Sequence, residues 1–295
     1  MSDKYDTPDL ESGRHVQDTT SPMSRQMTAM TLTNEQYERL FFQPSAPKRG
    51  DASKRFANPS LLGLLGFLIP YTSTILTLCQ FQGAVPPTTL VGLTGDYYFL
   101  GGIAMVIAGL GEFVLGNTFP FAVFIIYGAH WCSLGYTQDP IHNTLEPFGG
   151  ASAALGAEYN SSQCFHNITM YDAQKPSDRN SIDIVNRALV SFVFLIGTLR
   201  VNVPFVLTFV GLVGLFSFIA AADAFVPHIK TAADEVHLFT LLKAAGGFGF
   251  LGLICGWYLA IIEICETVQL PCPLPVFDLS SKVFPPKKKE TSKET

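Results

Sequence analysis

The sequence predicts an all-α polytopic membrane protein in which six transmembrane helices form one bundle. Of its 295 residues, 48% are hydrophobic and only 15% are charged, a composition that favours a membrane protein over a soluble domain. A helix needs about 20 apolar residues to cross the hydrocarbon core. Six segments approach that length, at about 61–81, 97–115, 119–138, 183–199, 201–222 and 240–262.

The first three predicted spans are supported by long stretches with few charges. Residues 56–95 contain no Asp, Glu, Lys or Arg, and they include span one. Span two carries one carboxylate, Glu112, near its inner end, and span three carries no formal charge. These three segments therefore satisfy the composition that a lipid-facing helix requires.

Span four is weaker than spans five and six, which are long and apolar. Only a dozen uncharged residues lie between Arg187 and Arg200. This segment reaches span length only if it begins near Asp183, with Arg187 extending its charged end to the interface. Residues 56–268 then form the transmembrane domain.

The charges in the tails set the predicted orientation. Residues 1–55 are polar and contain no apolar core, so we expect a disordered cytosolic tail without a cleaved signal. Basic residues precede span one and recur at 287–289, and the positive-inside rule then places both termini, including the tail 269–295, in the cytosol. The loop 139–182 falls outside, where Asn160 and Asn167 begin glycosylation sequons. We expect a plasma-membrane protein.

Composition argues against several other functions. The sequence has no basic face, so it predicts no nucleic-acid binding. Its six cysteines are scattered without a CxxC pair, so neither a metal site nor a cofactor is predicted. There is also no nucleotide-binding loop or nucleophile elbow, and we expect no enzyme. Small residues in the spans, including the GxxxG of Gly252 and Gly256, favour tight helix packing and leave an oligomer interface open.

Ionisable groups at membrane depth often face a cavity or a partner. Glu112 fits a proton-carrying or pore-mouth carboxylate, or an interfacial residue that ends span two. Asn117 and Thr118 follow it, and Asn117 is expected to cap the next helix. Tyr127 and His130 are three residues apart, on one helical face. His130 either titrates near neutral pH or is a hydrogen-bonded structural histidine.

Five sequence blocks together resemble the acetate uptake transporter family, the YaaH/SatP-like acetate and succinate permeases, in a fungal-type form. "NPSLLGLLGF" (58–67) resembles the family signature NPAPLGLxGF. The other blocks follow in order: "GGIAMVIAGLGEFVLGNTF" (101–119), "YGAHW" (127–131), "GTLR" (197–200) and "GLICGWYLAIIEI" (252–264). The resemblance implies a six-helix protomer, a hexamer, and a pore through each protomer.

The resemblance also implies a pore constriction at Phe67, Tyr127 and Leu212. A narrow apolar ring disfavours a charged carboxylate, so the acid either crosses in its neutral form or meets polar groups that replace its hydration shell. Asn58, Tyr127 and Asn202 are candidates for that replacement.

The implied function is transport of acetate or related short-chain carboxylates, proton-coupled or as the neutral acid. Met105 stands where the family often has Gln, and His130 where an aromatic residue is frequent. These departures motivate one alternative, a non-transporting membrane sensor or regulator. Export of ammonium or another small solute through the same pore is a further alternative.

Overall fold

The computed structural model describes residues 56–86, 88–150, 156–169, 189–280 and 282–283, and this part of the chain is helical without strands. The predicted tail 1–55 lies outside it. The helices are α4 (Ser60–Leu78), α5 (Thr88–Val91), α6 (Thr94–Asp96), the π-helical segment η2 (Tyr97–Ala104), α7 (Met105–Leu115), α8 (Thr118–Gln138), α9 (Ala157–Thr169), α10 (Leu189–Thr198), α11 (Val203–Phe225) and α12 (Ala232–Thr267). Short 3-10 turns are η1 (Phe81–Gly83), η3 (Pro140–His142), η4 (Glu146–Phe148) and η7 (Val226–His228).

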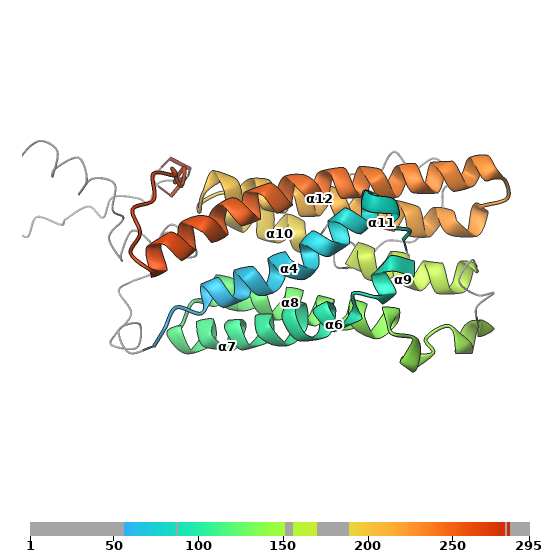
Figure 1. The fold of residues 1–295 in the computed structure, drawn as a ribbon, viewed down its shortest axis with the longest axis horizontal. Helices are drawn as coiled ribbons and strands as arrows, with labels where there is room; N and C mark the ends of the chain where they lie inside the picture. Colours follow the sequence, from blue (N-terminus) through green and yellow to red (C-terminus); the bar gives the residue numbers. More distant parts are fainter. Residues whose placement is uncertain (1–55, 87, 151–155, 170–188, 281, 284–295) are drawn as a thin grey trace, which may run out of the picture.

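The long helices lie side by side in one elongated bundle (Figure 1). The start of α4 and the end of α12 lie at the same end, which we call the terminal end. The turns after α8 and helix α9 lie at the opposite end, which we call the loop end (Figure 1).

Five helical segments in the described residues are long and apolar enough to cross a membrane. They begin at Ser60, Thr94, Thr118, Val203 and Ala232, where spans one, two, three, five and six are expected. The fourth position is held by α10, which covers ten residues from Leu189. The start expected for span four, near 183, lies outside the described residues.

Helices α11 and α12 extend beyond the predicted spans at the loop end. α11 continues to Phe225, past the predicted end at 222. α12 begins at Ala232 because Thr231 and Asp234 form a capping box, in which each side chain accepts the other's backbone N–H. Hydropathy alone ended the predicted spans at the nearest polar residues, whereas caps and turns end the helices.

The region expected as an outer loop contains a packed helix. Helix α9 contacts α11 extensively and α10 to a lesser degree. Its mean composition is too polar for a membrane span, so no hydropathy scan finds it. α9 therefore covers the loop end of the bundle.

Small residues bring α11 and α12 into backbone contact. A Cβ atom on Gly211 would lie 2.7 Å from the carbonyl oxygen of Phe248 and 2.8 Å from the nitrogen of Gly252. Gly252, the first residue of the GxxxG, also faces the Tyr71 hydroxyl of α4. In this structure, therefore, that glycine serves packing within the protomer.

The segment after α12 folds back onto the terminal end. Gln269 adopts a left-handed conformation with φ of 57°, and Leu270 N donates to Cys265 O at 2.7 Å, which is a Schellman turn. The returning chain packs Val276 against Leu259 and Ile262. The beginning of the predicted cytosolic tail 269–295 is thus docked on the bundle.

Candidate functional site

A cavity of about 840 Å³ opens at the loop end of the bundle. Helices α4, α8, α9, α11 and α12 all contribute to its wall, and we call it the vestibule. Its deepest lining residues, nearest the middle of the bundle, are Tyr71, His130, Trp131, Leu215 and Phe216. Ligand sites are typically cavities of this size with mostly apolar walls, and this vestibule is the main candidate site in the described chain.

The predicted constriction lies directly beneath the vestibule floor. Phe67, Tyr127 and Leu212 are 8%, 2% and 2% exposed and belong to one buried cluster. Each lies three or four residues, about one helical turn, before a floor residue on its own helix. Phe67 precedes Tyr71, Tyr127 precedes Trp131, and Leu212 precedes Leu215. The structure therefore brings the three predicted residues to one depth of the bundle.

Aromatic contacts hold the constriction together. The ring centroids of Phe67 and Tyr127 are 6.0 Å apart in an edge-to-face arrangement, and Phe67 stacks on Tyr71 at 4.7 Å. The Tyr127 hydroxyl forms a hydrogen bond with Ser191 Oγ of α10. The layer is apolar, and its polar atom at Tyr127 already has a partner, so it opposes passage of a hydrated ion.

His130 lies on the vestibule floor beside a second histidine. His130 Nδ1 and His166 Nε2 of α9 are 3.3 Å apart, and their rings stack at 5.4 Å. Burial lowers the pKa of His166. A bond between two imidazoles requires one donor and one acceptor, which neutral rings provide. The structure thus gives His130 a hydrogen-bonded partner that the sequence did not reveal.

Glu112 belongs to a saturated polar network at the terminal end. Its side chain is fully buried; Oε1 accepts from Ser60 Oγ at 2.5 Å, and Oε2 accepts from Asn117 Nδ2 at 2.7 Å. Asn117 is the residue before α8, but its side chain does not cap that helix. The cap expected from sequence is therefore wrong: the amide nitrogen is directed at the buried carboxylate, and in this orientation Oδ1 accepts no backbone N–H of α8.

The other candidate polar residues at the terminal end mostly serve the backbone. Asn58 Oδ1 accepts from Ser60 N at 3.0 Å, and Asn202 Oδ1 accepts from Phe205 N at 2.8 Å to cap α11. Thr118, in the first turn of α8, is exposed. These groups are not gathered around the constriction in this structure.

Met105 fills the contact between three helices. It is 1% exposed, and its side chain lies close to Gly66 of α4 and Gly128 of α8. Met is a flexible apolar residue suited to such gaps. These contacts give Met105 a packing role.

Both sequon asparagines point into the fold. Asn160 is 5% exposed, and its Nδ2 donates to Gly156 O at 2.9 Å. Asn167 Nδ2 donates to Asp223 Oδ2 at 2.8 Å. These nitrogens are the atoms to which a glycan would be attached, so we expect neither sequon to carry one in the folded protein.

Asp223 is the polar residue of the vestibule that sequence reasoning missed. It lines the cavity from α11, one residue beyond the predicted end of span five. An expected helix that continued past residue 222 would have placed this carboxylate at membrane depth, as α11 does. Groups of three or more His, Cys, Asp or Glu suited to a metal ion were not found in the described chain.

The apolar helices, the end-opening cavity and the buried aromatic layer are the architecture of a polytopic membrane protein. The chain belongs to the GPR1/FUN34/yaaH family, whose model matches residues 41–281. This family places it among transporters rather than enzymes.

Individual relatives agree with that assignment. Protein alcS of Aspergillus fumigatus is 32% identical over 254 residues, which cover 86% of each chain. Acetate permease A of Emericella nidulans is 28% identical, covering 77% of this chain and 67% of the permease. The structure of the bacterial acetate channel SatP matches 75% of this chain and 99% of its own, with a TM-score of 0.50 and 22% identity. That likeness supports the fold.

Proposed function

We propose that this protein conducts acetate and similar short-chain carboxylates through a pathway inside each protomer. The pathway runs from the vestibule through the layer of Phe67, Tyr127 and Leu212 toward the terminal end. The observation that carries the proposal is the position of this buried aromatic layer one turn beneath the cavity floor, in a chain whose relatives include an acetate permease.

The constriction favours the neutral acid over its anion. Desolvating an ionised carboxylate is expensive, and the Tyr127 hydroxyl is already bonded to Ser191. Asn58 and Asn202 hold backbone groups, so they would have to release these before hydrating a passing anion. Uptake as the neutral acid, or together with a proton, requires no such rearrangement.

The assembly and setting that we propose follow the sequence. The charge pattern favours cytosolic termini in the plasma membrane, and the family resemblance favours a hexamer with one pore in each protomer. Apolar side chains remain exposed along η2 and α7, including Ile103, Ile107, Leu110 and Phe113, as a lipid or protomer contact would require.

Labelled acetate uptake tests the proposal. Cells that express the chain should accumulate acetate above an empty-vector control, and the excess should increase as the medium is acidified. The absence of any excess at acidic pH would contradict transport and favour the sensor or regulator hypothesis.

Phe67→Ala tests the pathway. Removing this ring should widen the layer and raise uptake of a longer acid, such as butyrate, relative to acetate. A matched control is Phe218→Ala, which alters an aromatic contact between α11 and α12. If Phe67→Ala is produced in the membrane and its acid preference is unchanged, the constriction assignment is wrong.

A further inference from the structure

The charged residues of the vestibule wall all have the same sign. Its carboxylates are Asp139, Glu146 and Asp223, and its described lining contains neither Lys nor Arg. α4 contributes Tyr71, Thr74 and Leu78, while η7 and α12 contribute the apolar Val226, Leu238 and Leu242. A wall with one sign of charge concentrates ions of the opposite sign and repels ions of its own.

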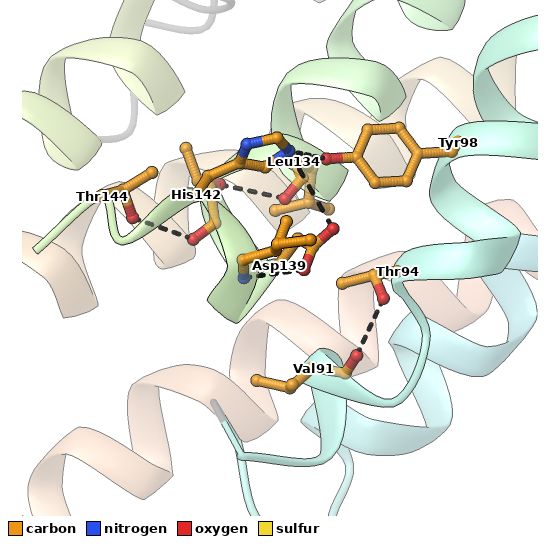
Figure 2. Close-up of polar contacts among 9 residues, drawn as sticks. Val91, Thr94, Tyr98, Leu134, Asp139, His142 and Thr144 are labelled. Carbon is orange, nitrogen blue, oxygen red and sulfur yellow. Dashed lines mark hydrogen bonds and ion pairs between the residues drawn. The ribbon is translucent and has the colours of Figure 1, made fainter.

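Asp223 is the deepest and best shielded of the three carboxylates. Glu146 is exposed. Asp139 lies at the rim near His142 (Figure 2), with Oδ2 3.9 Å from Nε2, and its Oδ1 accepts from Ile141 N. Water screens charges at such positions. Asp223 is half-buried in α11, closer to the floor, where its field is screened less.

The partner of Asp223 does not cancel its charge. Asn167 donates to Oδ2, and an amide is neutral. The titratable groups that interact with this carboxylate come from α9, namely Tyr159 and Cys164. His130 of α8 lines the same cavity at its floor and pairs with His166 of α9. Burial raises the pKa of Cys164 to about 11, and Asp223 adds to the rise, so its field extends to the α9 wall.

We propose that Asp223 is a specificity-determining residue, which makes the vestibule admit neutral acids and small cations while it repels carboxylate anions. A carboxylate anion that approaches the floor must pass the Asp223 carboxylate, which repels it when ionised. A protonated acid meets only dipoles, and the amide of Asn167 holds the Asp223 carboxylate toward the cavity wall. The charge at 223 thus selects the transported form before the constriction is reached.

The consequence for uptake rests on the proposed carboxylate transport, whereas the field itself does not. In the unmodified protein, the ratio of acetate uptake at pH 7 to that at pH 5 should be low. Asp223→Asn should raise this ratio by about fivefold or more, as expected from removing one charge at roughly 8 Å through a dielectric constant of about 40. Asp223→Glu should restore the low ratio. Glu158→Gln, at an exposed carboxylate of α9 outside the vestibule lining, is the matched control and should leave it unchanged.

A second measurement reports the field without transport. Gln163 lines the vestibule from α9, one turn before Asn167. In Gln163→Cys, the introduced thiol should react faster with a trimethylammonium methanethiosulfonate than with the sulfonate reagent, after correction for the parent chain. Adding Asp223→Asn should slow the cationic reagent and speed the anionic one by about fivefold each, and so reduce that ratio of rates by about 25-fold.

The two measurements separate the possible failures. If the unmodified chain moves no acetate at any pH, the proposed function fails, and the reagent rates still decide whether Asp223 sets the field. If the rate ratio is unchanged by Asp223→Asn, the inference is overturned. It is also overturned if acetate uptake occurs and the ratio of uptake at pH 7 to that at pH 5 is the same in Asp223→Asn as in the unmodified protein, when both proteins reach the membrane.

Discussion

The two ends of the bundle place a carboxylate in opposite surroundings. At the terminal end, Glu112 is fully enclosed and accepts from both Ser60 and Asn117. At the loop end, Asp223 faces a cavity of about 840 Å³ and accepts from Asn167. The contrast teaches that depth in a membrane does not by itself make an ionisable residue part of a pathway.

A saturated carboxylate contributes mainly to structure, while a carboxylate on a cavity wall acts on what enters the cavity. The polar atoms of a closed network are already satisfied, so removing one leaves others unpaired. A wall residue can lose its charge with little loss of stability, because water in the cavity replaces the lost contact. Variants at the two positions should therefore affect different properties.

The largest expected effect is on stability, in Glu112→Ala. It leaves the hydroxyl of Ser60 and the amide of Asn117 without their buried acceptor, and should lower the free energy of unfolding by about 2–4 kcal/mol. Thermal unfolding in detergent measures it. Asp223→Ala is the comparison and should cost less than about 1 kcal/mol, since its neighbour Asn167 borders the cavity. Equal losses would remove the distinction between the two ends.

For acetate uptake we expect the reverse order, with a smaller effect at Glu112 than at Asp223, and Glu112→Gln tests this. Because the amide keeps an acceptor oxygen in the network, we expect acetate uptake to retain its pH dependence, whereas Asp223→Asn changes it. Uptake across pH provides the measurement, normalised to protein in the membrane. A pH profile that flattens in Glu112→Gln would return Glu112 to the pathway.

A smaller effect is expected between the two ends, at the constriction. Tyr127→Phe removes the hydroxyl that pairs with Ser191, a residue with no exposed surface. The unpaired serine should cost about 1 kcal/mol, while the ring layer stays in place. Thermal unfolding should therefore shift slightly, and the preference among acids should not change. A changed preference would show that this hydroxyl contacts the substrate.

The smallest expected effect concerns the sequons. The Asn160 and Asn167 amides are engaged inside the fold, so endoglycosidase treatment should not alter the electrophoretic mobility of protein expressed in a eukaryotic host. Asn160→Gln should migrate like the parent chain. A shift that Asn160→Gln or Asn167→Gln abolishes would mean that α9 does not adopt this arrangement in the cell.

The family resemblance named apolar residues that the fold brings together, whereas the contacts of the polar residues were not foreseen. Phe67, Tyr127 and Leu212 come from three helices and lie in one buried cluster, and their role as a constriction stays a prediction. Glu112 drew attention because it interrupts an apolar run, but its role depends on Ser60, which lies 52 residues earlier in the chain. Asp223 was overlooked because it follows the last apolar residue of a predicted span.

The sequence by itself determined the all-α membrane class, the position of the long helices and the membership of the family, since apolar length and motif order are local properties of the chain. Only the tertiary structure decided that α9 covers the loop end, that Glu112 is enclosed and that Asp223 faces the vestibule. Those outcomes depend on which side chains meet across helices, and contacts between distant segments have no signature in local composition.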